Sequence, residues 1–392
     1  MKNLKKVLAV LVALTLVVTC FAACGGTKDK ENKSNEIVIG ISGPLTGGAA
    51  QYGIAVVNAA QLAVDEINAA GGINGTKLKL VTADDEADSG DKAVSAYNTL
   101  KDQGMQIFLG TVTSGSALAV IDKTKADNMF QLTPSASADN VIANDNCFQI
   151  CFTDSNQGVG SAQYIAENNV AKKVAIIYDS SDAYSTGIYN TFKAEATKRN
   201  LDIVTEQAFQ KGNTDFSAQI QACKSAGAEL VFLPIYYTEA SLILEAASKV
   251  NYAPKFFGCD GLDGLLGIEG FNTKLAEGVM LLTPFAADAD DEATKKFVAS
   301  YKAKYNNEIP NQFAADAYDG VYIIAELLKA NNVTADMSAS QICDLLKADI
   351  ASDDFSYKGI TGAGAALTWD ASGAVSKKPM AVVIKDGAYV AL

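Results

Sequence analysis

Four loops rich in serine, threonine and glycine could bind a small anion. They cover residues 43–53, 110–116, 133–137 and 178–187. A hydroxyl-bearing loop that opens a helix offers O–H donors, backbone N–H groups and the positive end of the helix dipole, which together suit a carboxylate. Ser114 lies in the second loop, and Ser135 and Ser137 lie in the third. Helix capping explains each serine alone equally well, but their expected position at the strand ends of one sheet favours a shared binding role.

The residues that most enzymes use for catalysis are missing. Histidine is absent, which removes the commonest general base, the usual Ser–His and Cys–His pairs and most catalytic zinc sites. The sequence also has no G-x-S-x-G elbow and no cluster of metal ligands. We therefore expect no catalytic residue, no metal and no cofactor, and a secreted enzyme is the less favoured alternative to a binding protein.

The cysteines after residue 24 argue against a zinc site or a disulfide framework. They are Cys147, Cys151, Cys223, Cys259 and Cys343. Their number is odd, they are widely scattered, and none of them forms a C-x-x-C pair. We expect them to be small buried apolar residues.

Strand-like and helix-like segments alternate in two rounds along the chain. Strands are expected at 37–41, 78–82, 106–109 and 129–132, and then at 173–178, 202–206, 230–233 and 255–257. Helices are expected at 52–70, 91–104 and 116–127, then at 155–168, 185–199, 214–227 and 239–250, and finally at 292–305, 314–329 and 338–349. A strand hairpin is expected at 380–390. Repeated βα units predict parallel sheets covered by helices on both faces, with ligands bound at the carboxyl ends of the strands.

Length and charge limit the possible functions further. The chain has 392 residues, which is too long for one typical hydrophobic core and suits two lobes. Its formal charge is −13 and its body contains no basic run. Such a chain is a poor partner for nucleic acid.

The first 35 residues have the pattern of an export signal followed by a tether. Lys2, Lys5 and Lys6 precede an apolar run over 7–18, which is too short for a comfortable membrane span. The small residues before Cys24 resemble a bacterial lipobox, although Phe21 stands where leucine is commonest. This predicts a signal peptide over 1–23, a lipid on Cys24, a flexible tether over 24–35, and a protein anchored to the outer face of the cell membrane. An ordinary cleaved signal with an incidental cysteine is the alternative.

Six segments together resemble the leucine–isoleucine–valine binding proteins of ABC importers. They are residues 39–47, 65–75, 132–137, 154–158, 256–261 and 367–373. The resemblance extends from residue 37 to 392 and implies a type I periplasmic-binding-protein fold, which is an α/β fold with two doubly wound parallel-sheet lobes joined by three crossovers. The implied N-terminal lobe comprises 36–155 and 284–378, and the C-terminal lobe comprises 156–283 and 379–392.

The resemblance also implies a function and a set of partners. A monomeric receptor outside the membrane would capture an amino acid, branched-chain or similar, between its lobes and deliver it to ABC permease subunits. The side chain of that amino acid is left open, and an amide or an aromatic acid is an alternative ligand. A sensor that signals without transport is a further alternative, although the chain carries no signalling domain.

On the first lobe, the resemblance assigns three serines to the ligand. Ser114 and Ser137 would bind its α-carboxylate through hydroxyl and backbone N–H groups. Ser135 would offer backbone groups to both ends of the zwitterion. The disulfide that better-known family members carry near residues 84–87 and 113–114 is absent here.

Five further residues complete the implied site. Tyr184 and Tyr236 would cover the ligand from the second lobe, and Tyr52 and Gln51 would border the side-chain subsite. Asp260 would pair with the α-ammonium, at a position where the family often has the longer glutamate. Packing at a lobe surface is the alternative for Tyr184 and Tyr236, and a turn or helix cap is the alternative for Asp260.

Overall fold

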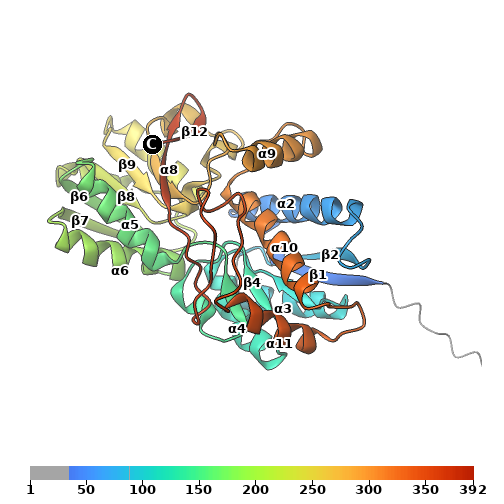
Figure 1. Cartoon of the computed structure of the whole chain (residues 1–392). Coiled ribbons are helices and arrows are strands. Elements are labelled where there is room, and N and C mark those ends of the chain that lie inside the picture. Colours follow the sequence, from blue (N-terminus) through green and yellow to red (C-terminus); the bar gives the residue numbers. More distant parts are fainter. Residues whose placement is uncertain (1–34, 88) are drawn as a thin grey trace, which may run out of the picture. The chain divides into compact units, whose positions relative to one another are not determined.

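The computed structural model describes residues 35–87 and 89–392 (Figure 1). The predicted signal peptide, Cys24 and all but the last residue of the predicted tether lie outside these residues. Within them, no helix has both the length and the apolar character needed to cross a membrane.

The first sheet has five parallel strands in the order β2-β1-β3-β4-β5. Its strands are Lys77–Asp84, Glu36–Gly43, Ile107–Leu109, Gln131–Thr133 and Cys147–Gln149. Ile37, Ile39 and Ile41 of β1 are completely buried, as expected for a β-branched run in a parallel sheet that has helices on both faces. The connecting helices are α2 (Ala50–Ala69), α3 (Gly90–Asp102) and α4 (Ser114–Ala126).

The second sheet has seven strands in the order β12-β11-β10-β9-β8-β6-β7. Its strands are Ala388–Ala391, Met380–Lys385, Met280–Thr283, Lys255–Gly258, Leu230–Leu233, Lys173–Asp179 and Asp202–Phe209. The connecting helices are α5 (Asp154–Glu167), α6 (Ala183–Lys198), α7 (Ser217–Ser225) and α8 (Tyr237–Lys249).

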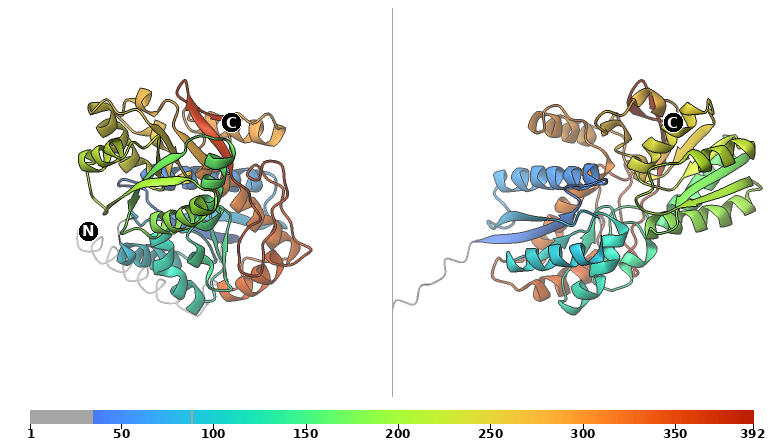
Figure 2. Two further views of the ribbon diagram at one scale, coloured as in Figure 1. Left: turned by 90° about the vertical axis from the view of Figure 1, so that its left-hand side faces the viewer. Right: turned by 180° about the vertical axis from the view of Figure 1, so that it is seen from behind.

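Both sheets are covered on two faces, as the side-chain alternation along β6 illustrates. Val174 and Ile176 pack into a core cluster with α5 and α6, whereas Ala175 and Ile177 belong to the cluster that contains α7 and α8. The two views in Figure 2 show these helix layers from the side and from behind. Helices α2 and α10 (Gln312–Ala330) pack together on the first sheet, and α3 packs beside α4.

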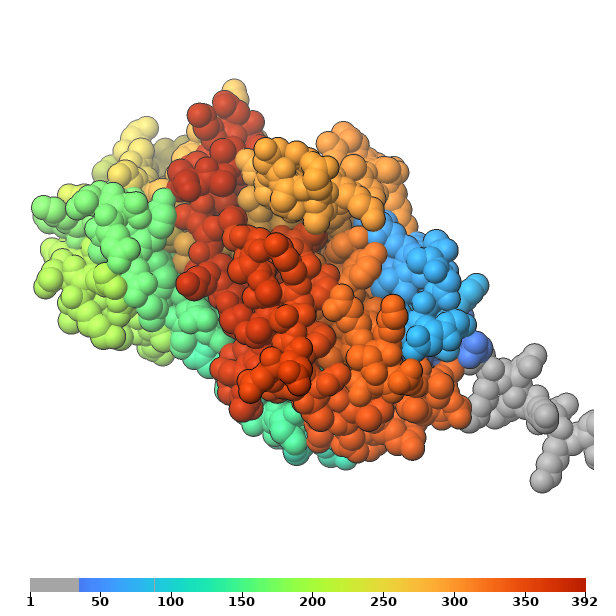
Figure 3. Space-filling view, viewed as in Figure 1, coloured from blue at the N-terminus to red at the C-terminus, as the bar shows by residue number. Residues whose placement is uncertain are grey.

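The chain passes between the two sheets three times, after β5, after β10 and before β11. The second passage leads into α9 (Glu292–Lys304), α10 and α11 (Ala339–Ile350). The third passage leads from α11 to the last two strands, and Figure 3 shows this red segment running over the surface. Trp369 anchors the segment, because its Nε1 donates to the Gln149 carbonyl of β5 at 2.6 Å.

The structure adds details that the sequence pattern did not predict. Strands β5 and β10 were not assigned, because runs of three and four residues show no clear period. The predicted hairpin forms, but β11 pairs antiparallel with both β10 and β12, so the second sheet is mixed rather than wholly parallel. The five cysteines from Cys147 onward are buried, as predicted, and they are not paired with one another.

Candidate ligand-binding site

The strand ends of the two sheets contribute to one small cavity, which we call the cradle. It is lined by Tyr52, Val112, Thr113, Ser114, Ser135, Ser137, Tyr184, Tyr236, Asp260, Gly261 and Phe313. Seven of the eight ligand residues expected from the sequence are therefore brought together. The exception is Gln51, which lines a different cavity and donates from Nε2 to the Gly267 carbonyl at 3.0 Å.

Ser114 is positioned as the first residue of α4, directly after Thr113 at the N-cap. Its Oγ accepts hydrogen bonds from the backbone N–H groups of Ser137 at 3.2 Å and Ala138 at 3.1 Å. These two bonds tie the β4 loop to the start of α4. The Ser114 hydroxyl has no protein acceptor among the described residues, so its proton is available for a ligand oxygen at the helix N-terminus.

Ser137 differs from Ser114 because its hydroxyl proton is already used. It donates to Asp154 Oδ1 at 2.7 Å, and Gln157 Nε2 donates to its oxygen at 3.3 Å. Asp154 is buried and its Oδ2 has no hydrogen-bond partner. Burial holds the pKa of Asp154 well above its usual range, and the negative charge of Asp260 raises it further. Both hydrogen-bond donors of Ser137 are therefore used within the protein, its hydroxyl by Asp154 and its backbone N–H by Ser114.

Asp260 begins a short 3₁₀ helix, Asp260–Leu262, just after β9. Its Oδ1 accepts the Tyr184 hydroxyl at 2.7 Å, and its backbone N–H donates to Gln157 Oε1 at 3.1 Å. Burial raises the pKa of Asp260 to about 7, and the hydrogen bond from Tyr184 lowers it in part. No basic side chain forms an ion pair with Asp260 among the described residues. A buried carboxylate in this position is costly unless a cation approaches it.

Aromatic rings complete the walls of the cradle. The rings of Tyr184 and Tyr236 stack with centroids 5.0 Å apart, and Tyr52 lies 4.4 Å from Phe313. The Tyr52 hydroxyl donates to the Gly261 carbonyl at 2.5 Å. This bond joins α2, on the first sheet, to the loop after β9 of the second sheet, so the rings also connect the two sides of the cradle.

Residues 36–368 match the family described as "Periplasmic binding protein". Leu/Ile/Val-binding protein homolog 3 of Brucella melitensis is 34% identical over 310 residues, which cover 78% of this chain and 82% of that protein. The leucine-, isoleucine-, valine-, threonine-, and alanine-binding protein of Pseudomonas aeruginosa is 29% identical over 306 residues, with 78% and 81% covered.

Among solved structures, the substrate-binding protein LivJ of Streptococcus pneumoniae, in complex with isoleucine, is similar to this chain. Its TM-score is 0.81 and its identity is 29%, over 91% of this chain and 99% of that one. The chain belongs to the periplasmic binding protein family. Membership confirms the resemblance to the leucine–isoleucine–valine binding proteins and the two-lobed α/β fold expected from the sequence.

The cradle of this periplasmic binding protein is narrow. Its cavity volume is about 10 Å³, which is room for a single water-sized molecule. Besides the Tyr52 bond, Thr238 Oγ1 donates to the Gly48 carbonyl at 2.6 Å and joins the two sides at the cleft. An amino acid is larger than this cavity, and these two bonds cross from the first side of the cleft to the second.

Four residues that support the cradle were not assigned a role from the sequence. Asp154 and Gln157 lie in a segment that carries the family resemblance, but their spacing gave no sign of contact with Ser137. Gln312 and Phe313 begin α10, and the helix was expected to start only at Ala314. Gln312 Nε2 donates to the Asp260 carbonyl at 2.9 Å. A capping asparagine, Asn311, was the local signal that could have extended the helix to include them.

The cradle offers hydrogen-bond donors for a carboxylate, acceptors for an ammonium group, and aromatic walls. None of the groups of histidine, cysteine, aspartate and glutamate within the described residues has an arrangement that could hold a metal ion.

Proposed function

We propose that this protein is an extracytoplasmic receptor that binds a free α-amino acid in the cradle and delivers it to an ABC permease. The observation that carries the proposal is Asp260, a buried carboxylate that lines the cradle together with Ser137 and has no cation paired to it in the described residues. An α-ammonium would supply that missing charge, and the Ser114 hydroxyl would donate to the α-carboxylate. The family, whose named relatives bind amino acids, supports the same conclusion.

We further propose that residues 36–155 with 284–378, and 156–283 with 379–392, act as two lobes that separate and close as rigid bodies. Ser114, Ser135 and Ser137 belong to the first lobe, while Tyr184, Tyr236 and Asp260 belong to the second. Only the closed arrangement offers a ligand both sets of groups, so binding must favour closure. Small-angle scattering should show a smaller radius of gyration with ligand, and an unchanged radius at saturation would contradict the clamp.

Calorimetry on the purified full chain tests the amino-acid proposal. An amino acid should bind, while its des-amino analogue should bind far more weakly because it leaves Asp260 without a partner. Asp260→Ala should weaken binding of the amino acid by about 2–5 kcal/mol, as for other buried charge pairs that lose one member. It should change binding of the des-amino analogue much less. Equal affinity for both ligands would indicate a receptor for a simple organic acid.

Anchoring of the receptor is proposed to depend on a lipid at Cys24. Cys24→Ala should move the protein from the membrane fraction to the soluble fraction, with Cys20→Ala as the matched control in the same predicted signal. Retention of the Cys24→Ala protein in the membrane fraction would place the anchor elsewhere. We propose that the receptor acts as a monomer, contacts the permease when closed, and performs no chemical conversion of its ligand.

A further inference from the structure

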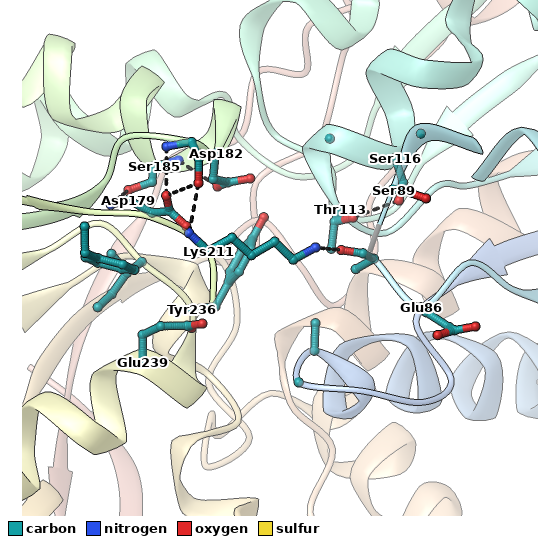
Figure 4. A pocket seen from close by; sticks show the side chains of 18 residues that line it. Glu86, Ser89, Thr113, Ser116, Asp179, Asp182, Ser185, Lys211, Tyr236 and Glu239 are labelled. Carbon is teal, nitrogen blue, oxygen red and sulfur yellow. Dashed lines mark hydrogen bonds between the residues drawn. The ribbon is translucent and has the colours of Figure 1, made fainter. Parts of the chain in front are cut away.

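A second, larger cavity lies beside the cradle, and we call it the chamber. Its volume is about 250 Å³, against about 10 Å³ for the cradle. The two cavities share Thr113 and Tyr236 in their walls. Figure 4 shows the chamber between the two sides of the cleft, with Tyr236 at its edge. The chamber therefore adjoins the cradle at Thr113 and Tyr236, where a ligand side chain that leaves the cradle would enter it.

The wall contributed by the second sheet is acidic. Asp179 is the last residue of β6, Asp182 caps α6, and Glu239 lies in the first turn of α8. Asp179 Oδ1 accepts the backbone N–H of Ser181 at 2.8 Å. No other side chain pairs with the carboxylate of Glu239 among the described residues. The three acids belong to three different elements, so only the fold brings their charges together.

The charges of these acids are incompletely compensated. Burial raises the pKa of Asp182 to about 6, and Asp179 adds to the rise while Lys211 lowers it. Burial also raises the pKa of Glu239, and both Asp179 and Asp182 contribute to that shift. These carboxylates therefore repel one another in a partly desolvated space, where a cation is attracted more strongly than in bulk water.

The basic side chain at the chamber does not balance this charge. Lys211 extends across the chamber in Figure 4, and its Nζ donates to the Ala87 carbonyl at 2.6 Å. Glu86, a fourth acid of the wall, pairs with Lys92 at 2.6 Å. Among the described residues that line the chamber, Lys211 is the one basic residue, and the acidic ones are Glu86, Asp179, Asp182 and Glu239.

The remaining walls offer polar groups for the end of a long side chain and apolar surface for its methylene groups. Ser89, Thr113 and Ser116 present hydroxyl oxygens on the side of the first sheet, and Thr113 Oγ1 donates to Ser116 Oγ at 3.2 Å. Phe209 and Ile235 supply apolar surface. Hydroxyl and carboxylate oxygens accept hydrogen bonds from an ammonium group, and methylene groups pack against apolar side chains.

We infer that the chamber receives a positively charged side chain, so that the ligand is a basic amino acid such as ornithine or lysine. The inference rests on the proposed function, because the α-amino and α-carboxylate groups must occupy the cradle for the side chain to reach the chamber. It sets this chain apart from relatives named for leucine, isoleucine and valine.

Paired ligands of equal length test the inference on the purified full chain. Ornithine and norleucine have the same number of side-chain heavy atoms, as do lysine and 2-aminoheptanoate, and each pair differs by one ammonium in place of a methyl group. Calorimetry should give at least about tenfold tighter binding of the basic member of a pair, the difference made by one modest charge interaction. Equal or tighter binding of norleucine would overturn the inference while leaving the amino-acid receptor intact. Absence of binding by all four ligands and by leucine would overturn both proposals.

Two substitutions test whether the preference for a basic side chain depends on the acids of the chamber wall. Glu239→Gln and Asp182→Asn each keep the shape of the side chain, and asparagine remains a good helix cap. Each should weaken ornithine or lysine binding about tenfold and change norleucine binding less than twofold. Glu245→Gln is the matched control, because Glu245 lies on α8 outside the chamber walls. Equal losses for ornithine and norleucine in both variants would overturn the role of the chamber.

Discussion

Asp260 and Asp316 are two buried aspartates that differ in their partners. Asp316 Oδ1 pairs with Lys377 Nζ at 2.5 Å, and both side chains are almost completely buried. The same Nζ donates to Thr361 Oγ1 at 2.8 Å. Asp260 lies close enough for the charge of Asp316 to raise its pKa, yet it has Tyr184 as its side-chain partner and no lysine.

Under the proposed function, this difference separates an acid that stabilises the fold from one that binds a ligand. The Asp316–Lys377 pair holds the third crossover segment against α10, and its charges cancel within the protein. Asp260 carries a charge that the described residues leave unneutralised. In that proposal a free amino acid would supply the missing ammonium on binding, so the ligand rather than the fold would offset the energetic cost of burying Asp260.

The largest loss of stability should come from removing Lys377, the cation that pairs with Asp316. Lys377→Met keeps much of the volume but leaves Asp316 buried without a counter-charge. It should lower the free energy of unfolding by about 3–5 kcal/mol, measured by urea unfolding at pH 7.5. Lys378→Met, at the exposed neighbouring position, should change it by less than about 0.5 kcal/mol. Similar losses for both variants would remove the distinction between the two aspartates.

A gain in stability is expected when the charge of Asp260 is removed. Asp260→Asn eliminates a buried carboxylate without a cation and should raise the stability of the ligand-free protein by about 1–3 kcal/mol at pH 8. The same variant should lose most of its affinity for amino acids. Urea unfolding gives the first quantity and calorimetry the second. A ligand-free Asp260→Asn protein that is clearly less stable would show that Asp260 also serves the fold.

Binding should depend on pH through the same group. Burial raises the pKa of Asp260 to about 7 from an ordinary value of 3.8, so the folded, ligand-free protein takes up a proton there as the pH falls. The protonated form cannot pair with an ammonium, and affinity should fall by up to about tenfold per pH unit below pH 7. Above pH 7 the affinity should level off. Calorimetry from pH 8 to pH 5.5 measures this, with the des-amino analogue as the ligand that should lack the decline.

The same pKa shift of Asp260 also determines how the stability of the folded protein depends on pH. Because the folded pKa of Asp260 lies above the unfolded value, its contribution lowers the stability of the ligand-free protein as the pH rises from about 4 to 7. Ligand should reverse this trend in thermal unfolding. Asp154, whose pKa burial also raises, contributes with the same sign, so Asp260→Asn should reduce the pH dependence without abolishing it.

The sequence predicted the fold well where elements were long and periodic. The helices of both rounds and the longer strands were located within a few residues, because their faces are buried in a regular pattern. Strand β5, Cys147–Gln149, was missed because three residues have no detectable period. The pairing of β10 with β11 depends on contacts between segments about 100 residues apart, which local patterns do not encode.

The site was predictable to the extent that its residues lie in recognisable loops. The serines and Asp260 follow strands, and their segments carry the family resemblance. Gln51 was grouped with Tyr52, but adjacent residues on a helix point about 100° apart, so Tyr52 faces the cradle while Gln51 faces another cavity. Asp154 and Phe313 come from distant parts of the chain and meet the site only in three dimensions.

Trp369 gives this protein an intrinsic optical reporter at one defined place. It is the single tryptophan of the chain, it is buried, and it contacts Phe355 and the Gln149 carbonyl rather than the cradle. Its fluorescence therefore reports whether the third crossover remains in contact with β5. The ring is shielded from water in the folded protein and becomes exposed to water on unfolding. A shift of its emission wavelength on adding ligand would mean that the strain of closure reaches the crossover, and an unshifted spectrum would locate the bending elsewhere.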